Sequence, residues 1–539
     1  MSAASITAGE LHALLEGGAP VALLDLRERG AFERGHIFRA TPLPRRLLET
    51  RLPALITCPR TPIVLCDADG SLSTLAAPTL SRMGYGDVRS LAGGIAGWRG
   101  HHAGDGGRTT VQGLNVPSKV FGERVLHELK TPEISPEDLE TRMAAGEDLL
   151  IVDARTPEEY SRGCIPGAWS VPGGELVLRI GELIQRPETT IVVHCGGRTR
   201  SYLGAESLRR IGLPNPIVAV RNGTMGWVLA GLELERGAAR WAPPVSAKSR
   251  TLASMAAKRV AAEEDVPFLA SEEVRQRWER REAENVCLFD VRTAEEYGAG
   301  HVAGAVWAPG GQLVQATDEY IAVSAASIVL ICDGFVRSAM TAAWLRRMGF
   351  REVAVLAGGL AAWKQSRGAV ETGRPTRTPW GYEAARAATA RVAPAASFGD
   401  ALVLNVDPSD VYARGHVPGA GWVCRSRLEP LIAGIASDAR RSIVVTCADG
   451  LQSTLAAASL AGLGYTAVRV LDGGMRAWVE AGLPVESGLT RPLDQVDDIV
   501  LKPYDRGRVA MEAYLRWEEA LDAEGRSPHT LLPETEPRP

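Results

Sequence analysis

The chain has 539 residues, too many for one ordinary core, and length alone predicts roughly three to five domains. Its 60 basic and 64 acidic side chains leave a net charge of −4, so charge gives no support for binding to nucleic acid or to an anionic membrane. The apolar content of 45% is typical of a globular protein, and no apolar run approaches the ~20 residues that span a bilayer.

The N-terminal stretch MSAASITAGELHALLEGG has no basic segment followed by an apolar one, so no signal peptide is expected. The eight cysteines are dispersed without C-x-x-C pairs, which favours a reducing compartment, and the nine histidines form no metal-ligand cluster. We therefore expect a cytoplasmic protein with no metal and no other cofactor.

Three landmarks recur four times along the chain. An apolar strand ends at Asp25, Asp153, Asp290 or Asn405, and a second strand–loop–helix passage follows each of them. The loop residue at equivalent places is Asp67, Cys195, Cys332 or Cys447, always 42 residues after the first landmark. A tryptophan closes each unit 31 or 32 residues later, at Trp98, Trp227, Trp363 and Trp478. This register indicates four homologous units.

Within each unit, strands alternate with helical segments, which predicts an α/β fold with a parallel sheet flanked by helices. The expected domains are residues 1–105, 125–238, 262–372 and 388–489, followed by a C-terminal helix and tail at 490–539. Chain order suggests that unit one pairs with two and unit three with four. The amphipathic segment 505–525 is expected to be a helix docked on its own, fourth domain, and the last residues are expected to be loose.

The second unit carries the most distinctive loop, IVVHCGGRTRS, in which Cys195 follows a buried strand. Ser201 is predicted to cap the next helix, whose dipole and N–H groups would favour a thiolate at Cys195. Arg198 and Arg200 add donors suited to an oxyanion. The alternative is a small buried apolar cysteine, but the Gly-Gly and the two arginines favour a nucleophile that meets an anionic substrate.

Four motifs together resemble the rhodanese family of sulfurtransferases, and the resemblance covers nearly the whole chain as a tandem array. They are D-x-R-x-x-x-E-[FY], G-H-[IV]-x-G-A, a six-residue C-x4-R loop and a terminal G-G-x-x-x-W. The resemblance implies a doubly wound α/β domain around a five-stranded parallel sheet in each unit. It also implies a thiosulfate sulfurtransferase.

In that family's chemistry, the Cys195 thiolate takes the outer sulfur of thiosulfate, sulfite leaves, and cyanide or a thiol removes the sulfur from the resulting persulfide. Whether a protein also accepts the sulfur is left open. The loop residues expected to bind substrate are Gly196, Gly197, Arg198, Thr199, Arg200 and Ser201. Related phosphatases use a longer C-x5-R loop for a tetrahedral oxyanion, so the shorter loops here argue against phosphatase activity.

The four sites are not equivalent. The third unit keeps Cys332 and Arg337, but Asp333 beside the cysteine should oppose thiolate formation. In the fourth unit Cys447 remains, whereas Gln452 replaces the arginine and Asp449 adds negative charge.

The first unit is expected to be inactive, because Asp67 stands where the nucleophile belongs and a carboxylate cannot carry a persulfide. Cys66 is interpreted as a structural residue that the strand turns away from the loop. The catalytic candidates are therefore Cys195, Cys332 and Cys447, with Arg337 as a further substrate-binding residue.

Other recurring residues are expected to be structural: ion pairs in the D-x-R motifs, tryptophans as core residues, and Cys58, Cys287 and Cys424 as packing residues. A second function stays open beside the enzyme, namely a persulfide carrier or scaffold with little thiosulfate turnover.

Overall fold

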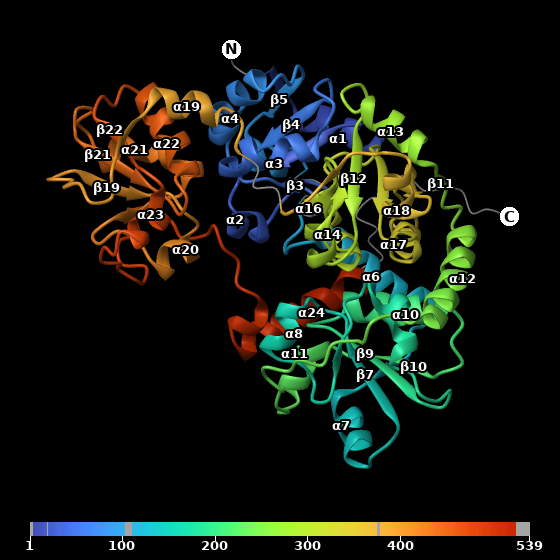
Figure 1. Ribbon diagram of the computed structural model, residues 1–539. Coiled ribbons are helices and arrows are strands. Elements are labelled where there is room, and N and C mark those ends of the chain that lie inside the picture. Colours follow the sequence, from blue (N-terminus) through green and yellow to red (C-terminus); the bar gives the residue numbers. More distant parts are fainter. Residues whose placement is uncertain (1–3, 19, 103–109, 375–377, 524–539) are drawn as a thin grey trace.

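A computed structural model describes residues 4–18, 20–102, 110–374 and 378–523 (Figure 1). This part of the chain contains four five-stranded sheets, and all neighbouring strands within each of them are parallel. The tandem α/β architecture is thus confirmed. The expected loose tail lies outside the described residues.

Every sheet repeats one strand order, in which the fourth strand of the unit is central. Written as hydrogen-bonded neighbours, the strands are β1 (Ala4–Ile6), β5 (Val88–Leu91), β4 (Ile63–Cys66), β2 (Ala22–Asp25) and β3 (Thr41–Pro42) in the first unit; β6 (Glu133–Ile134), β10 (Ile217–Val220), β9 (Thr190–His194), β7 (Leu149–Asp153) and β8 (Trp169–Ser170) in the second; β11 (Phe268–Leu269), β16 (Val353–Leu356), β15 (Ser327–Ile331), β12 (Val286–Asp290) and β14 (Val306–Trp307) in the third; and β18 (Ala390–Val392), β22 (Val468–Leu471), β21 (Ile443–Thr446), β19 (Leu402–Asn405) and β20 (Gly421–Trp422) in the fourth. The third unit also has a short antiparallel pair, β13 (His301–Val302) with β17 (Val370–Glu371).

Helices connect the strands in each unit. They are α1 (Ala8–Glu16), α2 (Arg29–Arg34), α3 (Leu48–Leu55), α4 (Ser71–Arg82) and α5 (Gly94–His101); α7 (Pro136–Ala144), α8 (Pro157–Arg162), α9 (Leu176–Arg179), α10 (Thr199–Arg210) and α11 (Gly223–Leu229); α13 (Ser271–Glu279), α14 (Ala294–Ala299), α15 (Gly310–Gln315), α16 (Thr317–Tyr320), α17 (Val336–Arg347) and α18 (Gly359–Gln365); and α20 (Ser409–Arg414), α21 (Leu428–Ile435), α22 (Leu451–Gly462) and α23 (Gly474–Glu480). Connecting and terminal elements are α6 (Val116–Leu129), α12 (Ala247–Glu263), α19 (Tyr382–Ala388), α24 (Arg508–Ala523) and the 3-10 turns η1 (Arg45–Leu47), η2 (Ile180–Glu182), η3 (Arg425–Arg427) and η4 (Pro503–Asp505).

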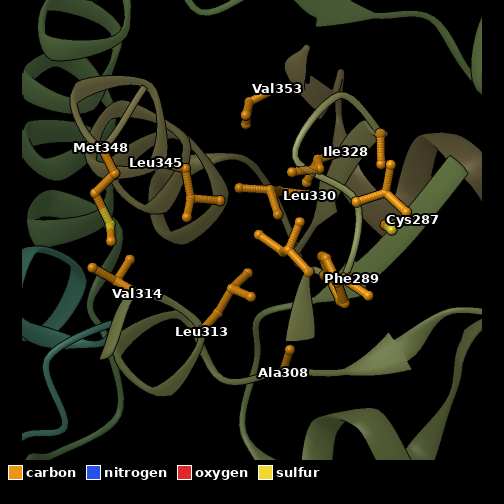
Figure 2. Close-up of a cluster of buried hydrophobic side chains, with 14 of the residues drawn as sticks. Cys287, Phe289, Ala308, Leu313, Val314, Ile328, Leu330, Leu345, Met348 and Val353 are labelled. Carbon is orange, nitrogen blue, oxygen red and sulfur yellow. The ribbon is translucent and has the colours of Figure 1, made fainter. Parts of the chain in front are cut away.

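The central strands are buried on both faces, as their unbroken apolar sequences require. In β9, for example, Ile191, Val192 and Val193 are each 0% exposed. Figure 2 shows the core of the third unit, where Phe289 of β12 and Leu330 of β15 lie near Leu345 of α17. Burial of such side chains contributes about 1.5–3 kcal/mol each and holds the strand ends, with their loops, in place.

The expected pairing of units by chain order is wrong. The second and third units pack together along α12, which contacts both α9 and α17, and Trp344 donates to Ser207 across this interface at 2.9 Å. The first and fourth units are joined by two buried ion pairs, Arg45–Glu429 and Arg425–Glu49, each at 2.6 Å. Contacts between residues far apart in the sequence, rather than chain order, therefore set the pairing.

The interface between the second and third units depends on glycines. A Cβ atom added at Gly174 would lie 2.9 Å from the amide nitrogen of Gly311 and 3.1 Å from Cα of Gly310. Backbone therefore approaches backbone at this point, and no larger side chain fits without moving the two units apart.

Helix α24 does not dock on its own unit, contrary to expectation. The chain leaves the fourth unit after α23, crosses to the second unit and places α24 against α6 and α11 (Figure 1). Met511 and Leu515 of α24 form an apolar cluster with Met225 of α11. The apolar stripe of the helix is thus covered by a unit more than two hundred residues away in sequence.

Candidate active site

Cys195 follows β9 directly and faces the start of α10. The helix begins at Thr199 with Arg198 before it, so the prediction of Ser201 as the capping residue is wrong. Instead, the Ser201 hydroxyl donates to the carbonyl of Arg198 at 2.7 Å and accepts from the Cys195 thiol, with Sγ and Oγ 3.5 Å apart. Cys195 is 2% exposed. The positive end of the α10 dipole favours negative charge on its sulfur.

Arg200 is held in the loop by a bidentate ion pair with Glu159 of α8. Its Nη1 and Nη2 atoms donate to the two carboxylate oxygens at 2.6 and 3.0 Å. Burial alone would raise the pKa of Glu159, but the Arg200 guanidinium outweighs it and holds that pKa well below its ordinary value. The arginine is therefore pre-oriented beside Cys195, with its charge partly balanced by the carboxylate.

Arg198 joins the loop to two distant helices. It forms a bidentate pair with Glu123 of α6, at 2.8 and 2.7 Å, and its Nη1 atom also donates to Asn222 and to Glu519 of α24. Its side chain is 6% exposed. Most of its donors are thus committed to protein acceptors, which makes the side chain a clamp on the loop.

The glycine-containing motif near the end of each unit packs on the loop. Gly223 has a φ of +52°, and a Cβ there would collide with the carbonyl oxygen of Cys195. Gly94, Gly359 and Gly474 stand in the same relation to Asp67, Cys332 and Cys447. Only glycine permits this contact, so the recurrence of the motif has a direct physical cause.

The two glycines after Cys195 differ in what surrounds them. A Cβ at Gly197 would lie 3.0 Å from Cε of Met225 and 3.1 Å from an oxygen of Glu518, so α24 approaches the loop closely there. A Cβ at Gly196 would meet only ordinary contacts, the nearest being 3.7 Å from Arg155.

Cys195 lines a cavity of about 940 Å³. The wall is made by the second unit's loop together with parts of the first unit, the third unit and the C-terminal segment. Lining residues from these other parts include Arg29, Lys119, Glu319, Lys502, Tyr514 and Glu518. The site is consequently assembled from several parts of the chain, whereas the loop motif by itself indicated a site within one unit.

Helix α24 contributes site residues that the sequence did not reveal. Glu518 accepts from the hydroxyl of Thr199 at 3.0 Å, and Glu519 contacts Arg198 at 3.1 Å. The sequence does show acidic residues on this helix and basic ones in the loop, but no spacing connects elements so far apart.

In the third loop, the arginine is already paired with carboxylates. Arg337 is 1% exposed and pairs with Glu296 at 2.6 Å, with Asp333 at 2.8 Å and with Glu175 of the second unit at 2.7 Å. Cys332 is 0% exposed and lies 3.2 Å from the hydroxyl of Ser338. Burial, with a contribution from Asp333, raises the pKa of the Cys332 thiol.

The fourth loop also disfavours a thiolate. Burial, with the nearby Asp407 carboxyl, raises the pKa of Cys447 to about 11. Gln452, which replaces the loop arginine, accepts at 3.0 Å from Arg425, and Arg425 is in turn paired with Glu49 of the first unit. Arg425, which lies outside the loop motif, thus places a guanidinium beside Gln452. The loop motif alone did not indicate this.

In the first unit, the Asp67 carboxylate stands at the nucleophile position and is bound by the loop around it. The Asp67 carboxylate accepts hydrogen bonds from the backbone of Asp69 at 2.9 Å, from Gly70, and from both the amide and the hydroxyl of Ser73, at 2.6 and 2.7 Å. Cys66 points into the core and is 0% exposed. The loop of this fold is therefore a ring of donors that accommodates a negatively charged group.

The D-x-R motifs form buried ion pairs, as expected. The aspartate–arginine distances are 2.6 Å for Asp25–Arg27, 2.7 Å for Asp153–Arg155 and 2.5 Å for Asp290–Arg292. Each arginine also donates to a glycine carbonyl in the following segment, which fixes the strand end to the next turn. The four tryptophans of the third landmark are all buried, at most 9% exposed.

Among the described residues, no three His, Cys, Asp or Glu side chains are grouped so that they could hold a metal ion. All eight cysteines are free thiols. No helix in the described ranges has the length and apolarity needed to cross a membrane.

Comparison with known proteins identifies relatives over the whole chain. The profile of the rhodanese-like domain matches residues 7–101, 135–230, 272–366 and 392–481. The structure is similar to the crystal structure of a thiosulfate sulfurtransferase from Pseudomonas aeruginosa, with 38% identity, a TM-score of 0.88 and 97% of both chains covered. A sulfurtransferase of Allochromatium vinosum is 33% identical over 102 residues, covering 19% of this chain and 92% of that protein. The 3-mercaptopyruvate sulfurtransferase of Escherichia coli K12 is 27% identical over 248 residues, covering 36% and 87%.

Proposed function

From the premise that this chain belongs to the rhodanese family and is a sulfurtransferase of the rhodanese type, we propose that it transfers sulfane sulfur from thiosulfate, mainly through Cys195. The observation that carries the proposal is the position of Cys195 beside Arg200 in the wall of a cavity of about 940 Å³. The proposed acceptor is cyanide or a thiol, and the proposed location is the cytoplasm, in keeping with the free thiols.

The reaction has two balanced halves. The Cys195 thiolate attacks the outer sulfur of thiosulfate, the sulfur–sulfur bond breaks, and sulfite leaves with the bonding electrons. The acceptor then attacks the outer sulfur of the Cys195 persulfide, and the electron pair of the broken bond returns to the Cys195 sulfur. This covalent route predicts ping-pong kinetics.

The first unit supports the role of the loop in this scheme. Asp67 shows that the backbone amides of this loop type, together with a serine, accommodate a negatively charged group at the nucleophile position. In the second unit the equivalent amides belong to Gly197, Arg198 and Ser201. There they would stabilise the thiolate and the persulfide, while Arg200 would bind the sulfonate oxygens and the departing sulfite.

Cys332 and Cys447 are proposed as minor nucleophiles. Their raised pKa values reduce the thiolate fraction at neutral pH, and Arg337 is already engaged by three carboxylates. We propose that the third unit, which lines the Cys195 cavity, mainly supports the second-unit site.

The test compares Cys195→Ser, Cys332→Ser and Cys447→Ser, which make the same change in three equivalent loops. Thiosulfate:cyanide turnover should be lost in Cys195→Ser and retained in the other two. Mass spectrometry after thiosulfate treatment should show one added sulfur atom on the Cys195 peptide. Turnover that survives Cys195→Ser contradicts the proposal.

The same assay separates the alternatives. Persulfide on Cys195 with negligible turnover of thiosulfate would favour the carrier function. If the Cys195 persulfide forms faster from 3-mercaptopyruvate than from thiosulfate, 3-mercaptopyruvate takes the place of thiosulfate as the donor.

A further inference from the structure

The cavity at Cys195 is larger than an inorganic sulfur donor needs. Its volume of about 940 Å³ lies near the upper end of the ~300–1,000 Å³ range of pockets that enclose drug-sized organic ligands. Thiosulfate and cyanide would fill only the part beside the loop. The remaining space is bordered by α6, by the third unit and by the C-terminal segment from Val500 to Glu518.

Most cations in this wall already have carboxylate partners. Arg29 pairs with Glu319 at 2.7 Å, and Arg506 pairs with Glu33 at 2.7 Å. Lys119 differs: its side chain lines the cavity and the residue is only 6% exposed, yet it has no ion pair or hydrogen bond with any side chain in the described ranges. An ammonium that lines a cavity without a carboxylate partner can bind an anionic group of a ligand.

Aromatic rings hold the Lys119 ammonium in place. Its Nζ atom lies 4.7 Å from the ring centre of Tyr514 and 4.8 Å from that of Trp517, both on α24. These cation–π contacts orient the charge but leave its hydrogen-bonding capacity unused. The carboxylate of Glu518 attracts the ammonium at longer range, although burial outweighs this and lowers the pKa of Lys119 to about 8.

The position of Lys119 relative to the loop sets the length of a ligand. The Tyr514 ring that contacts Lys119 also lies 3.5 Å from the Cβ position of Gly197 in the loop. One aromatic ring therefore separates the ammonium from the loop. The sulfonate of thiosulfate is bonded directly to the reacting sulfur, so it cannot reach across this ring while that sulfur meets Cys195.

A second lysine, Lys502, adds positive charge to the cavity that Lys119 lines. Lys502 lines the same cavity, is exposed, and makes no ion pair with another described side chain. It lies within the electrostatic influence of Glu159 and Arg200 of the second unit, and also of Arg29 and Glu319. The two lysines come from a connecting helix and from the C-terminal segment, so neither belongs to the repeated motifs.

We propose that Lys119, held between Tyr514 and Trp517, and Lys502 form a subsite that binds the carboxylate of an organic thiol acceptor of tripeptide size. The inference rests on the sulfurtransferase function proposed above. The acceptor thiolate attacks the outer sulfur of the Cys195 persulfide, the bond to the Cys195 sulfur breaks with its electrons going to that sulfur, and the acceptor leaves as a persulfide. The carboxylate, several bonds from the reacting sulfur, stays on the lysines throughout.

The test uses the full chain with thiosulfate as donor and compares glutathione, which carries carboxylates, with 2-mercaptoethanol, which carries none. The wild-type protein should favour glutathione in kcat/KM. Lys119→Met should lower the glutathione to 2-mercaptoethanol ratio about tenfold, the equivalent of one charged hydrogen bond. Lys119→Arg should retain part of the preference. Lys364→Met makes the same change on the exposed α18 of the third unit and should leave the ratio as it is.

A second measurement does not depend on turnover. S-methylglutathione cannot accept sulfur, so its calorimetric binding reports the subsite alone, and Lys119→Met should weaken this binding by a similar factor. An unchanged acceptor ratio together with unchanged binding of S-methylglutathione overturns the inference, even if thiosulfate:cyanide turnover is normal. If the wild-type protein shows no thiosulfate:cyanide turnover, that result refutes the proposed function instead.

Discussion

The carboxylate in the first loop offers a direct test of the loop as an anion site. Asp67→Asn keeps the size of the side chain but replaces one of its two oxygens by an NH₂ group. One oxygen of Asp67 accepts from the amides of Asp69 and Gly70, and the other from the amide and hydroxyl of Ser73. In either orientation of the new side-chain amide, its NH₂ group faces at least one backbone N–H, and that N–H then has no acceptor.

The expected cost follows from these bonds. A buried donor left without an acceptor costs about 1–3 kcal/mol, and the surviving bonds weaken because the acceptor is no longer charged. Together these terms give about 3 kcal/mol, equivalent to roughly a hundredfold change in a local opening equilibrium.

Hydrogen exchange followed by mass spectrometry is the suitable assay, because a four-unit chain does not unfold in one step. Peptides that cover residues 68–75 should exchange about a hundredfold faster in Asp67→Asn, since exchange tracks local opening. Asp69→Asn is the matched control: Asp69 is exposed and its side chain accepts from Ser71 at 3.0 Å, outside the ring of donors. Equal protection in wild type and Asp67→Asn, or equal losses in both variants, would refute the reasoning.

Three further predictions concern the other units and their interfaces. Alkylation of Cys447 by iodoacetamide, followed by peptide mass spectrometry, should accelerate about tenfold per pH unit from pH 8 to 10, because the thiol's pKa is about 11; a plateau by pH 8 would contradict this. Burial, with Glu319 nearby, raises the pKa of Asp318 to about 7, so the folded chain binds this proton more tightly than the unfolded chain and ionisation costs stability as pH rises. Relative to wild type at the same pH, Asp318→Asn should therefore slow hydrogen exchange in peptides that cover α16 (Thr317–Tyr320) by about 2–3 kcal/mol more at pH 8 than at pH 5, because the cost of ionisation grows up to the folded pKa; an equal effect at both pH values would exclude ionisation as the cause. Gly174→Ala should destabilise the interface of the second and third units by about 1–3 kcal/mol, measured as faster hydrogen exchange in peptides that cover residues 173–179, since the new Cβ would press on Gly310 and Gly311, whereas Gly298→Ala in α14, with nothing near its Cβ, should not.

The family, the four-unit organisation and the α/β fold could be read from the sequence, because they depend on local patterns. Apolar runs define the strands, and three landmarks at constant spacing define the repeats. The tertiary structure also explains one of these patterns: the glycine of the third landmark recurs because any Cβ would meet the carbonyl oxygen at the nucleophile position. The inequality of the loops was likewise visible, since Asp67, Asp333 and Gln452 are local substitutions.

What the sequence did not determine depends on contacts between distant segments. The pairing of units follows from buried ion pairs such as Arg425–Glu49 and from glycine contacts such as Gly174 with Gly311, which have no signature in chain order. The docking of α24 on the second unit follows from a match between its apolar stripe and Met225, and an amphipathic pattern does not name its partner. Arg198 similarly becomes a clamp because Glu123 and Glu519 reach it. Local sequence thus determined the loop that carries Cys195, whereas long-range packing alone decided what surrounds that loop.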